Sequence, residues 1–178
     1  ILLFPSFFIL FFLVLPSYLQ STYGANDSSV YLATMIAYAS TIFTMPLFGF
    51  LSDKFGRKKS MITVLIVFIL FGEFLFRLIL NPTFGYLLLF MLLYQIVLCA
   101  MAGNYFPFLA ELFSIKVRYS GVAFCYNFAF ALTSLSPIIV GFTFKHYKTT
   151  YSIATVFIIV AILTLISCIF TKDNNECI

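Results

Sequence analysis

Six runs of apolar residues, each close to the length needed to cross a membrane, take up nearly the whole 178-residue chain. A transmembrane helix needs about 20 consecutive apolar residues to cross a hydrocarbon core of about 30 Å. Hydrophobic residues make up 63% of the chain and charged residues 9%, whereas soluble domains carry about 25% charged residues. We therefore predict an all-α integral membrane protein with a single domain, 1–178, of six transmembrane helices near 1–19, 29–51, 61–80, 84–110, 119–144 and 151–171.

Helices are predicted because the runs are apolar on every side. The segments MITVLIVFILF (61–71) and SIATVFIIVAILTLI (152–166) lack the alternation of apolar and polar residues that marks a membrane β-strand. Lipid offers no partner for backbone N–H and C=O groups, so a span that is not part of a closed barrel must be a helix.

The basic residues predict how the helices are oriented. Short loops on the cytoplasmic side of a membrane are enriched in Lys and Arg. One side of the predicted topology holds seven basic residues and the other side two: Lys54, Arg57, Lys58, Lys59, Lys116, Arg118 and Lys172 against Lys145 and Lys148. We therefore expect both termini and the loops 52–60 and 111–118 to be cytoplasmic.

Several classes of function are excluded by what the chain lacks. The net charge of +4 follows from the membrane topology, so it does not indicate nucleic-acid binding. The four cysteines have neither CxxC spacing nor neighbouring ligands, so no disulfide framework or metal site is predicted. No Ser/His constellation, paired carboxylates, P-loop or GxGxxG is present. We predict a protein that is not an enzyme and uses no cofactor.

Charge is concentrated in GFLSDKFGRKK, residues 49–59, between the second and third apolar runs. Gly49 is expected to let a neighbouring helix approach closely, and Gly56 to adopt the positive φ of a tight turn. The basic residues are expected to anchor the turn at the anionic leaflet, each contributing about 1 kcal/mol: Lys54, Arg57, Lys58 and Lys59.

Asp53 is the one acid in this stretch. It lies at the C-terminal end of its predicted helix, where the helix dipole disfavours an anion by about 0.3–1 kcal/mol. We expect it to have a partner, which is Arg57, Arg118 or the N-terminus of another helix. The alternative, a loop that only enforces the membrane topology, explains the basic residues but not the presence of Asp53.

The stretch 49–59 fits the pattern Gly-x-x-x-Asp-Arg/Lys-x-Gly-Arg-Arg/Lys-Arg/Lys at every specified position. It thereby resembles the cytoplasmic loop signature of the major facilitator superfamily. That resemblance implies a secondary transporter made of two six-helix halves, each an inverted 3+3 repeat. It also implies that 49–59 is a conformational-switch loop, in which Asp53 holds the two halves together in one conformation and releases them in the other.

A second stretch, AELFSIKVRYSGVAFCYNFAFALTSLSPII (110–139), resembles the loop before helix 11, and helix 11 itself, in the metabolite:proton symporter branch of that family. VLPSYLQ (14–20) resembles the end of helix 7. The departures are Ser114 for Pro, Ile115 for Thr, and Thr133 and Ser134 for a common glycine pair. Together these stretches place the chain as the C-terminal half, helices 7–12.

This resemblance implies proton symport of a small polar metabolite or osmolyte, of the proline/betaine kind, across a bacterial cytoplasmic (inner) membrane. The implied partners are the solute, the proton, the lipid bilayer and an N-terminal six-helix half, either upstream or on a separate chain. The alternative is a truncated remnant or accessory membrane subunit that keeps the fold without transporting. No committed cation lies on the candidate cavity faces, which favours a zwitterionic or neutral solute.

Residues at the ends of the two basic loops are predicted to form a cytoplasmic latch. Glu111 and Arg118 bound the loop 111–118. Arg57 ends the neighbouring loop, and we expect it to form an ion pair with Glu111.

Polar residues recur at helical spacing on two of the predicted helices. Tyr31, Thr34, Tyr38 and Thr41 share one face of the second helix, and Ser120, Asn127 and Ser134 share one face of the fifth. The alternative use of such Ser and Thr residues is packing between membrane helices. The predicted cavity-lining residues are Tyr38, Thr41, Gln95, Tyr126, Asn127 and Ser134.

Glu73 and Arg77 are the acid and the base inside a predicted span. An intramembrane acid is a candidate proton carrier in a symporter. Glu followed by Arg at i, i+4 is also the favourable geometry for local pairing. We predict structural pairing.

Overall fold

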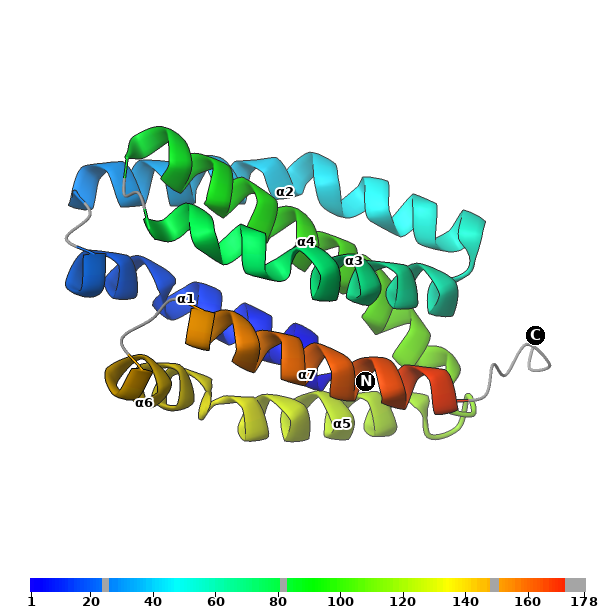
Figure 1. The fold of residues 1–178 in the computed structure, drawn as a ribbon. Helices are drawn as coiled ribbons and strands as arrows, with labels where there is room; N and C mark the ends of the chain where they lie inside the picture. The colour runs from blue at the N-terminus through cyan, green and yellow to red at the C-terminus, as the bar shows by residue number, and fades with distance from the viewer. Residues whose placement is uncertain (24–25, 81–82, 148–150, 172–178) are drawn as a thin grey trace.

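The computed structural model describes residues 1–23, 26–80, 83–147 and 151–171. Helices make up nearly all of these ranges, and no strand occurs in them, which confirms the predicted all-α fold. The helices run alongside one another (Figure 1). Their bounds are α1 (Leu3–Tyr23), α2 (Asp27–Phe55), α3 (Arg57–Arg77), the short 3-10 helix η1 (Leu78–Leu80), α4 (Phe84–Glu111), α5 (Arg118–Thr133), α6 (Ser136–Tyr147) and α7 (Tyr151–Phe170).

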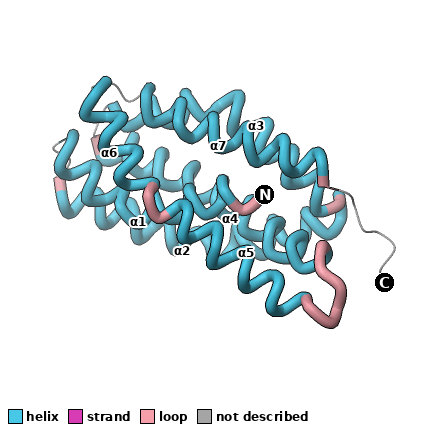
Figure 2. The backbone as a smooth tube through the Cα atoms, turned by 90° about the horizontal axis from the view of Figure 1, so that it is seen from below, coloured by secondary structure: helices cyan, strands magenta, loops and turns pink. Residues whose placement is uncertain are grey.

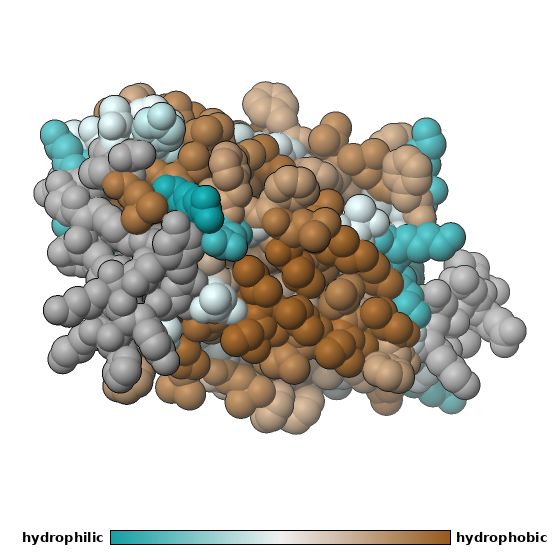
Figure 3. Space-filling view, viewed as in Figure 1, coloured by the Kyte–Doolittle hydropathy of each residue, from teal (hydrophilic) through white to brown (hydrophobic). Residues whose placement is uncertain are grey.

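Six segments of the described chain are long and apolar enough to cross a membrane. Five of them are single helices, with η1 extending α3, and the other runs from α5 into α6. Hydrophobic side chains cover the middle of the face seen in Figure 3, and hydrophilic residues gather at its right-hand edge. The described connections between spans lie at the two ends of the bundle (Figure 2), as expected for a bundle that crosses a bilayer, whereas the connection from α5 to α6 falls within the fifth span.

The fifth expected helix, 119–144, is divided in the structure. α5 ends at Thr133 and α6 begins at Ser136. Pro137 explains the division, because its nitrogen carries no hydrogen for the carbonyl of Thr133 four residues earlier. The Ser134 N–H still donates to the Phe130 carbonyl at 2.9 Å, and the Ile139 N–H donates to the Leu135 carbonyl at 3.0 Å.

A cluster of aromatic rings forms the centre of the core. Phe8 of α1 stacks on Tyr94 of α4 with ring centroids 3.8 Å apart. The Tyr94 hydroxyl donates to the Phe8 carbonyl at 2.8 Å, so this buried polar group is paired. Phe157 of α7 is fully buried, and its ring meets five others, those of Phe7, Phe8, Phe11, Phe68 and Phe76. We call these six phenylalanines and Tyr94 the core rings.

Two helices stay outside this core. α2 contributes few buried residues, and of α5 only Ala129 and Thr133 are buried. Large apolar side chains of α2 and α5 remain exposed, among them Phe43 at 80% and Phe124 at 71%. α2 is held mainly by α4.

The contact between α2 and α4 depends on a glycine. A Cβ added to Gly103 of α4 would lie 3.1 Å from the backbone nitrogen of Gly49 in α2. A Cβ added to Gly49 would meet nothing within 4 Å. The close approach expected at Gly49 therefore occurs there, but Gly103 is the residue whose missing side chain permits it.

Candidate functional site

Gly56 alone separates α2 from α3. Its φ of 91° lies in the left-handed region, which a glycine adopts without the steric cost of a Cβ, and this confirms the expected positive φ. The Gly56 N–H donates to the Ser52 carbonyl at 3.0 Å, and the Ser60 N–H donates to the Gly56 carbonyl at 2.9 Å. One residue thus ends α2, starts α3 and fixes the direction between them.

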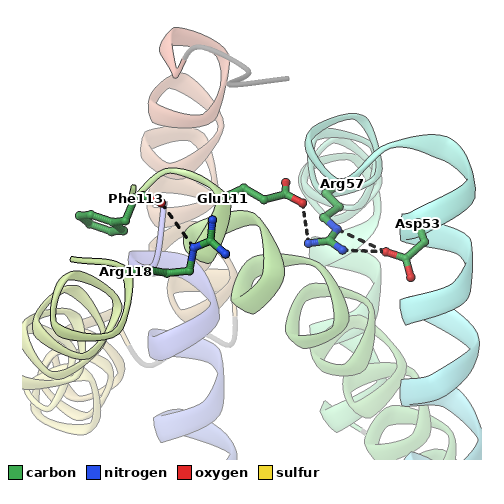
Figure 4. Close-up of polar contacts among 5 residues, drawn as sticks. All are labelled: Asp53, Arg57, Glu111, Phe113 and Arg118. Atoms are coloured by element: carbon green, nitrogen blue, oxygen red, sulfur yellow. Dashed lines mark hydrogen bonds and ion pairs between the residues drawn. The ribbon is translucent and has the colours of Figure 1, made fainter. Parts of the chain in front are cut away.

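Arg57, directly after this turn, joins three helix ends (Figure 4). Its Nε and Nη2 donate to Oδ1 of Asp53 at 3.3 and 3.1 Å. Its Nη1 lies 2.7 Å from Oε1 of Glu111 at the end of α4. The Arg57 side chain is 30% exposed, against 65% for Asp53 and 53% for Glu111. One guanidinium therefore serves two carboxylates, which are the expected Arg57–Glu111 pair and the partner expected for Asp53.

The loop that follows α4 is held to the start of α5. Nε of Arg118 donates to the Phe113 carbonyl at 3.4 Å, so the described partner of Arg118 is the loop backbone, whereas Glu111 pairs with Arg57. The Phe113 ring lies on Gly121, where an added Cβ would come within 2.6 Å of it. This packing accounts for Phe113, Arg118 and Gly121 in the quoted stretch.

Lys58 ties α3 to the end of α7, because its Nζ donates to the Thr171 carbonyl at 2.5 Å. The Gly56 turn, the loop 112–117 and the end of α7 thus share one end of the bundle, at the right in Figure 1. We call it the basic end, because the described basic residues there are Lys54, Arg57, Lys58, Lys59, Lys116 and Arg118. Lys172 lies outside the described residues, and the side chains of Lys145 and Lys148 lie outside the description as well.

A pocket of about 270 Å³ lies between α1, α2, α4 and α5, close to the middle of the first three of these helices. Four of the six predicted cavity-lining residues border it, namely Tyr38, Thr41, Gln95 and Tyr126. Its other lining residues are Ile9, Phe12, Leu13, Met45, Leu98, Cys99, Ala102, Tyr105 and Phe106. None of these lining residues is charged.

Gln95 is the buried polar group of this pocket. Its side chain is 2% exposed, and its Oε1 has no hydrogen-bond partner in the structure. A buried acceptor without a donor costs about 1–3 kcal/mol, so Gln95 marks a place where the pocket lacks a polar partner.

The other two predicted cavity residues lie outside this lining. Asn127 is exposed, and its Nδ2 donates to the Ala123 carbonyl of its own helix at 2.8 Å. The Ser134 hydroxyl likewise donates to the Ala131 carbonyl at 2.7 Å. Asn127 and Ser134, the latter one residue past the end of α5, thus bond to nearby backbone carbonyls and do not border this pocket.

Most of the aromatic lining, namely Phe12, Tyr105 and Phe106, was not among the predicted cavity residues. On α4 the lining residues recur at helical spacing from Gln95 onward, as Leu98, Cys99, Ala102, Tyr105 and Phe106. Extending the face of Gln95 along its helix would have found them.

Glu73 and Arg77 form the expected local pair on α3, with Nη2 of Arg77 3.2 Å from Oε1 of Glu73. Both side chains are about half exposed, at 52% and 55%. Neither borders the pocket. Within the described ranges, no group of three or more His, Cys, Asp or Glu could hold a metal ion.

Comparison with known protein families gives one match over nearly the whole chain. The model of the Major Facilitator Superfamily matches residues 1–175. A comparison with solved structures found no match.

Curated transporters are similar to the chain over most of its length. The inner membrane metabolite transport protein YhjE of Escherichia coli (strain K12) is 33% identical over 162 residues, which cover 86% of this chain and 35% of that protein. The glycine betaine/proline/ectoine/pipecolic acid transporter OusA of Dickeya dadantii (strain 3937) is 25% identical over 160 residues, 90% of this chain and 32% of that protein. The proline/betaine transporter of Salmonella typhimurium is 24% identical over the same shares. The chain thus spans about a third of the length of these relatives.

Proposed function

Because the chain belongs to the major facilitator superfamily, we propose that it forms the C-terminal six-helix half of a secondary transporter. In this proposal the transporter moves a small polar metabolite or osmolyte of the proline or betaine class in symport with protons. The names of the relatives support the solute class, since two of the three are transporters of proline or betaine. The chain contributes helices 7–12 and works with an N-terminal half.

The pocket between α1, α2, α4 and α5 is the observation that carries this proposal. Transporters of this architecture bind their solutes near the bilayer midplane, at the interface between repeats. The pocket lies near the middle of its helices and is bordered by hydroxyl, amide and aromatic groups. A lining without charge suits a zwitterionic or neutral solute better than an anion.

The exposed surface of α2 and α5 supports a partner half. Both helices carry large exposed apolar side chains. Each also contributes to the pocket lining, α2 through Tyr38 and α5 through Tyr126. Alternating access in this architecture is the rocking of one bundle against another around a fixed site. We infer that the N-terminal half covers this side and completes the site.

The ion pairs of the basic end are the proposed conformational latch. Arg57 links α2, α3 and α4 while leaving Asp53 65% exposed, so this carboxylate remains available to a second half. We propose that Asp53 holds that half in one conformation and releases it in the other. The excess of Lys and Arg supports a cytoplasmic orientation of the basic end and of both termini. The membrane in this proposal is a bacterial inner membrane.

Uptake measurements test the proposal. The chain is produced alone and together with a candidate N-terminal half, in cells lacking related carriers, and proton-driven uptake of labelled proline, glycine betaine and α-ketoglutarate is measured. We expect uptake of proline and glycine betaine only when both halves are present, and its loss when a protonophore collapses the gradient. No uptake in either form, with the chain correctly inserted, would instead support a non-transporting remnant or accessory subunit.

A further inference from the structure

Five aromatic residues from four helices border the pocket. Phe12 of α1 meets Tyr38 of α2 edge to face, with ring centroids 5.2 Å apart. The rings of Tyr105 and Phe106 of α4 lie 4.2 Å apart, and the rings of Phe106 and Tyr126 of α5 lie 5.5 Å apart. All five line the pocket. We call these residues the ring cage.

The ring cage differs from aromatic packing elsewhere in the chain. The core rings are all buried and pack against one another. Two rings of the cage, Tyr38 and Phe106, remain 46% and 40% exposed while bordering the pocket. Of the other cage rings, Phe12 and Tyr105 are buried, at 3% and 2% exposure, so Tyr38 and Phe106 are the cage rings with the most accessible surface in this chain.

The chemistry of this lining selects for a diffuse positive charge. The face of an aromatic ring carries negative potential and attracts cations, most strongly when both are removed from water. The partnerless Oε1 of Gln95 adds a second negative group to the same pocket. The lining residues include no carboxylate to bind a compact ammonium ion and no cation to bind an anion.

We propose that the ring cage binds the alkylated ammonium pole of the solute, while its carboxylate pole lies away from this chain's lining. The inference rests on the proposed function and adds to it the division of the zwitterion between the two halves. Gln95 accepts a hydrogen bond when the nitrogen bears N–H, as in a secondary ammonium. A quaternary ammonium relies on the rings.

Three ligands with the same methyl group arrangement test this division. Glycine betaine carries a trimethylammonium and a carboxylate, choline keeps the trimethylammonium without the carboxylate, and 3,3-dimethylbutyrate replaces the nitrogen of betaine with an uncharged carbon. Dissociation constants for the 178-residue chain in lipid nanodiscs are measured by saturation-transfer NMR on the nine equivalent methyl protons of each ligand. We expect choline and betaine to bind within about threefold of each other and 3,3-dimethylbutyrate at least about tenfold more weakly, which is the effect of a desolvated cation–π contact.

Ring substitutions locate the binding. Tyr38→Leu and Tyr126→Leu, on different helices, are each expected to weaken the binding of choline and betaine about fivefold or more and to leave the binding of 3,3-dimethylbutyrate unchanged. Tyr38→Phe keeps the ring and should stay within about twofold of the unsubstituted chain. Tyr31→Leu is the matched control, because Tyr31 lies on α2, is 54% exposed and does not border the pocket. Far-UV circular dichroism shows which variants are folded.

Three results would overturn the ring cage. The first is binding of 3,3-dimethylbutyrate as tight as that of betaine, and the second is no binding of any of the three ligands. The third is unchanged binding of choline in both leucine variants. Uptake by the paired halves is a separate measurement. A chain that binds choline but does not support uptake would refute the proposed function alone. Uptake by the paired halves, together with equally tight binding of 3,3-dimethylbutyrate and betaine, would refute the ring cage alone.

Discussion

The core rings and the exposed rings of the cage use the same residue types in different surroundings. Phe157 touches five neighbouring rings and has no exposed surface, whereas Tyr38 touches one ring of the cage and is 46% exposed. Helices in lipid gain little from the hydrophobic effect on associating, so close packing holds them together. The comparison indicates that α1, α3, α4 and α7 supply most of the stability. The side chains available for binding come from α2 and α5 and from the pocket-lining parts of α1 and α4.

The largest predicted effect lies in the core. Phe157→Ala removes a ring from the centre of the core rings and should lower the free energy of unfolding by about 3–5 kcal/mol. Phe170→Ala is the matched control, because Phe170 is on the same helix and 82% exposed. Unfolding in mixed micelles, followed by circular dichroism, measures both. Equal effects of the two changes would break the distinction between core and periphery.

The second-largest effect on the free energy of unfolding is expected at the contact between α4 and α2. Gly103→Ala places a methyl group 3.1 Å from the Gly49 nitrogen, and backbone atoms cannot rotate away, so we expect a loss of about 1–3 kcal/mol. Gly49→Ala is the matched control, since its Cβ meets nothing within 4 Å. The same unfolding measurement compares them. If Gly49→Ala were the more destabilising change, Gly103 would not be the residue whose missing side chain permits the close approach.

Smaller effects are expected at the basic end. Asp53→Asn and Glu111→Gln each remove one partner of Arg57 and should cost about 0.2–1 kcal/mol, as exposed ion pairs do. The two losses should not add, because both carboxylates share one guanidinium. For the same reason, exchanging the charges of Arg57 and Glu111 should restore the pair between α3 and α4 but leave Asp53 facing a glutamate. A double-mutant cycle on stability and uptake checks this, and strict additivity would argue against the shared guanidinium.

The smallest effect is predicted for Glu73→Gln. The Glu73–Arg77 pair is half exposed and lies within one helix, so its loss should change stability by no more than about 0.5 kcal/mol. Proton-coupled uptake should persist, because Glu73 does not border the pocket. Uptake that no longer responds to the proton gradient in this variant would make Glu73 the proton carrier.

The features that sequence predicted are those set by local chemistry. The six spans follow from apolar length, the positive φ of Gly56 follows from a turn of one residue, and the Arg57–Glu111 pair follows from opposite charges at neighbouring helix ends. Pro137 was also visible, and its missing N–H would have predicted the division between α5 and α6.

The features that sequence did not predict depend on which helices meet. Gly103 matters only because the backbone of α2 passes beside it. Periodicity put Asn127 on a common face with other polar residues, but it cannot tell which neighbour that face meets, and Asn127 bonds to its own helix. Tyr105 and Phe106 belong to the pocket only because α5 brings Tyr126 against them.

Gln95 offers the most direct test of the pocket as the transport site. Its buried Oε1 has no partner, so Gln95→Leu should raise the free energy of unfolding by about 1 kcal/mol or leave it unchanged. A secondary ammonium would supply the missing donor, and the same variant should therefore reduce labelled proline uptake about tenfold or more at equal abundance, when paired with the N-terminal half. A stable variant that takes up proline poorly is the predicted result. Uptake of proline at the unsubstituted rate would contradict the assignment of this pocket to transport.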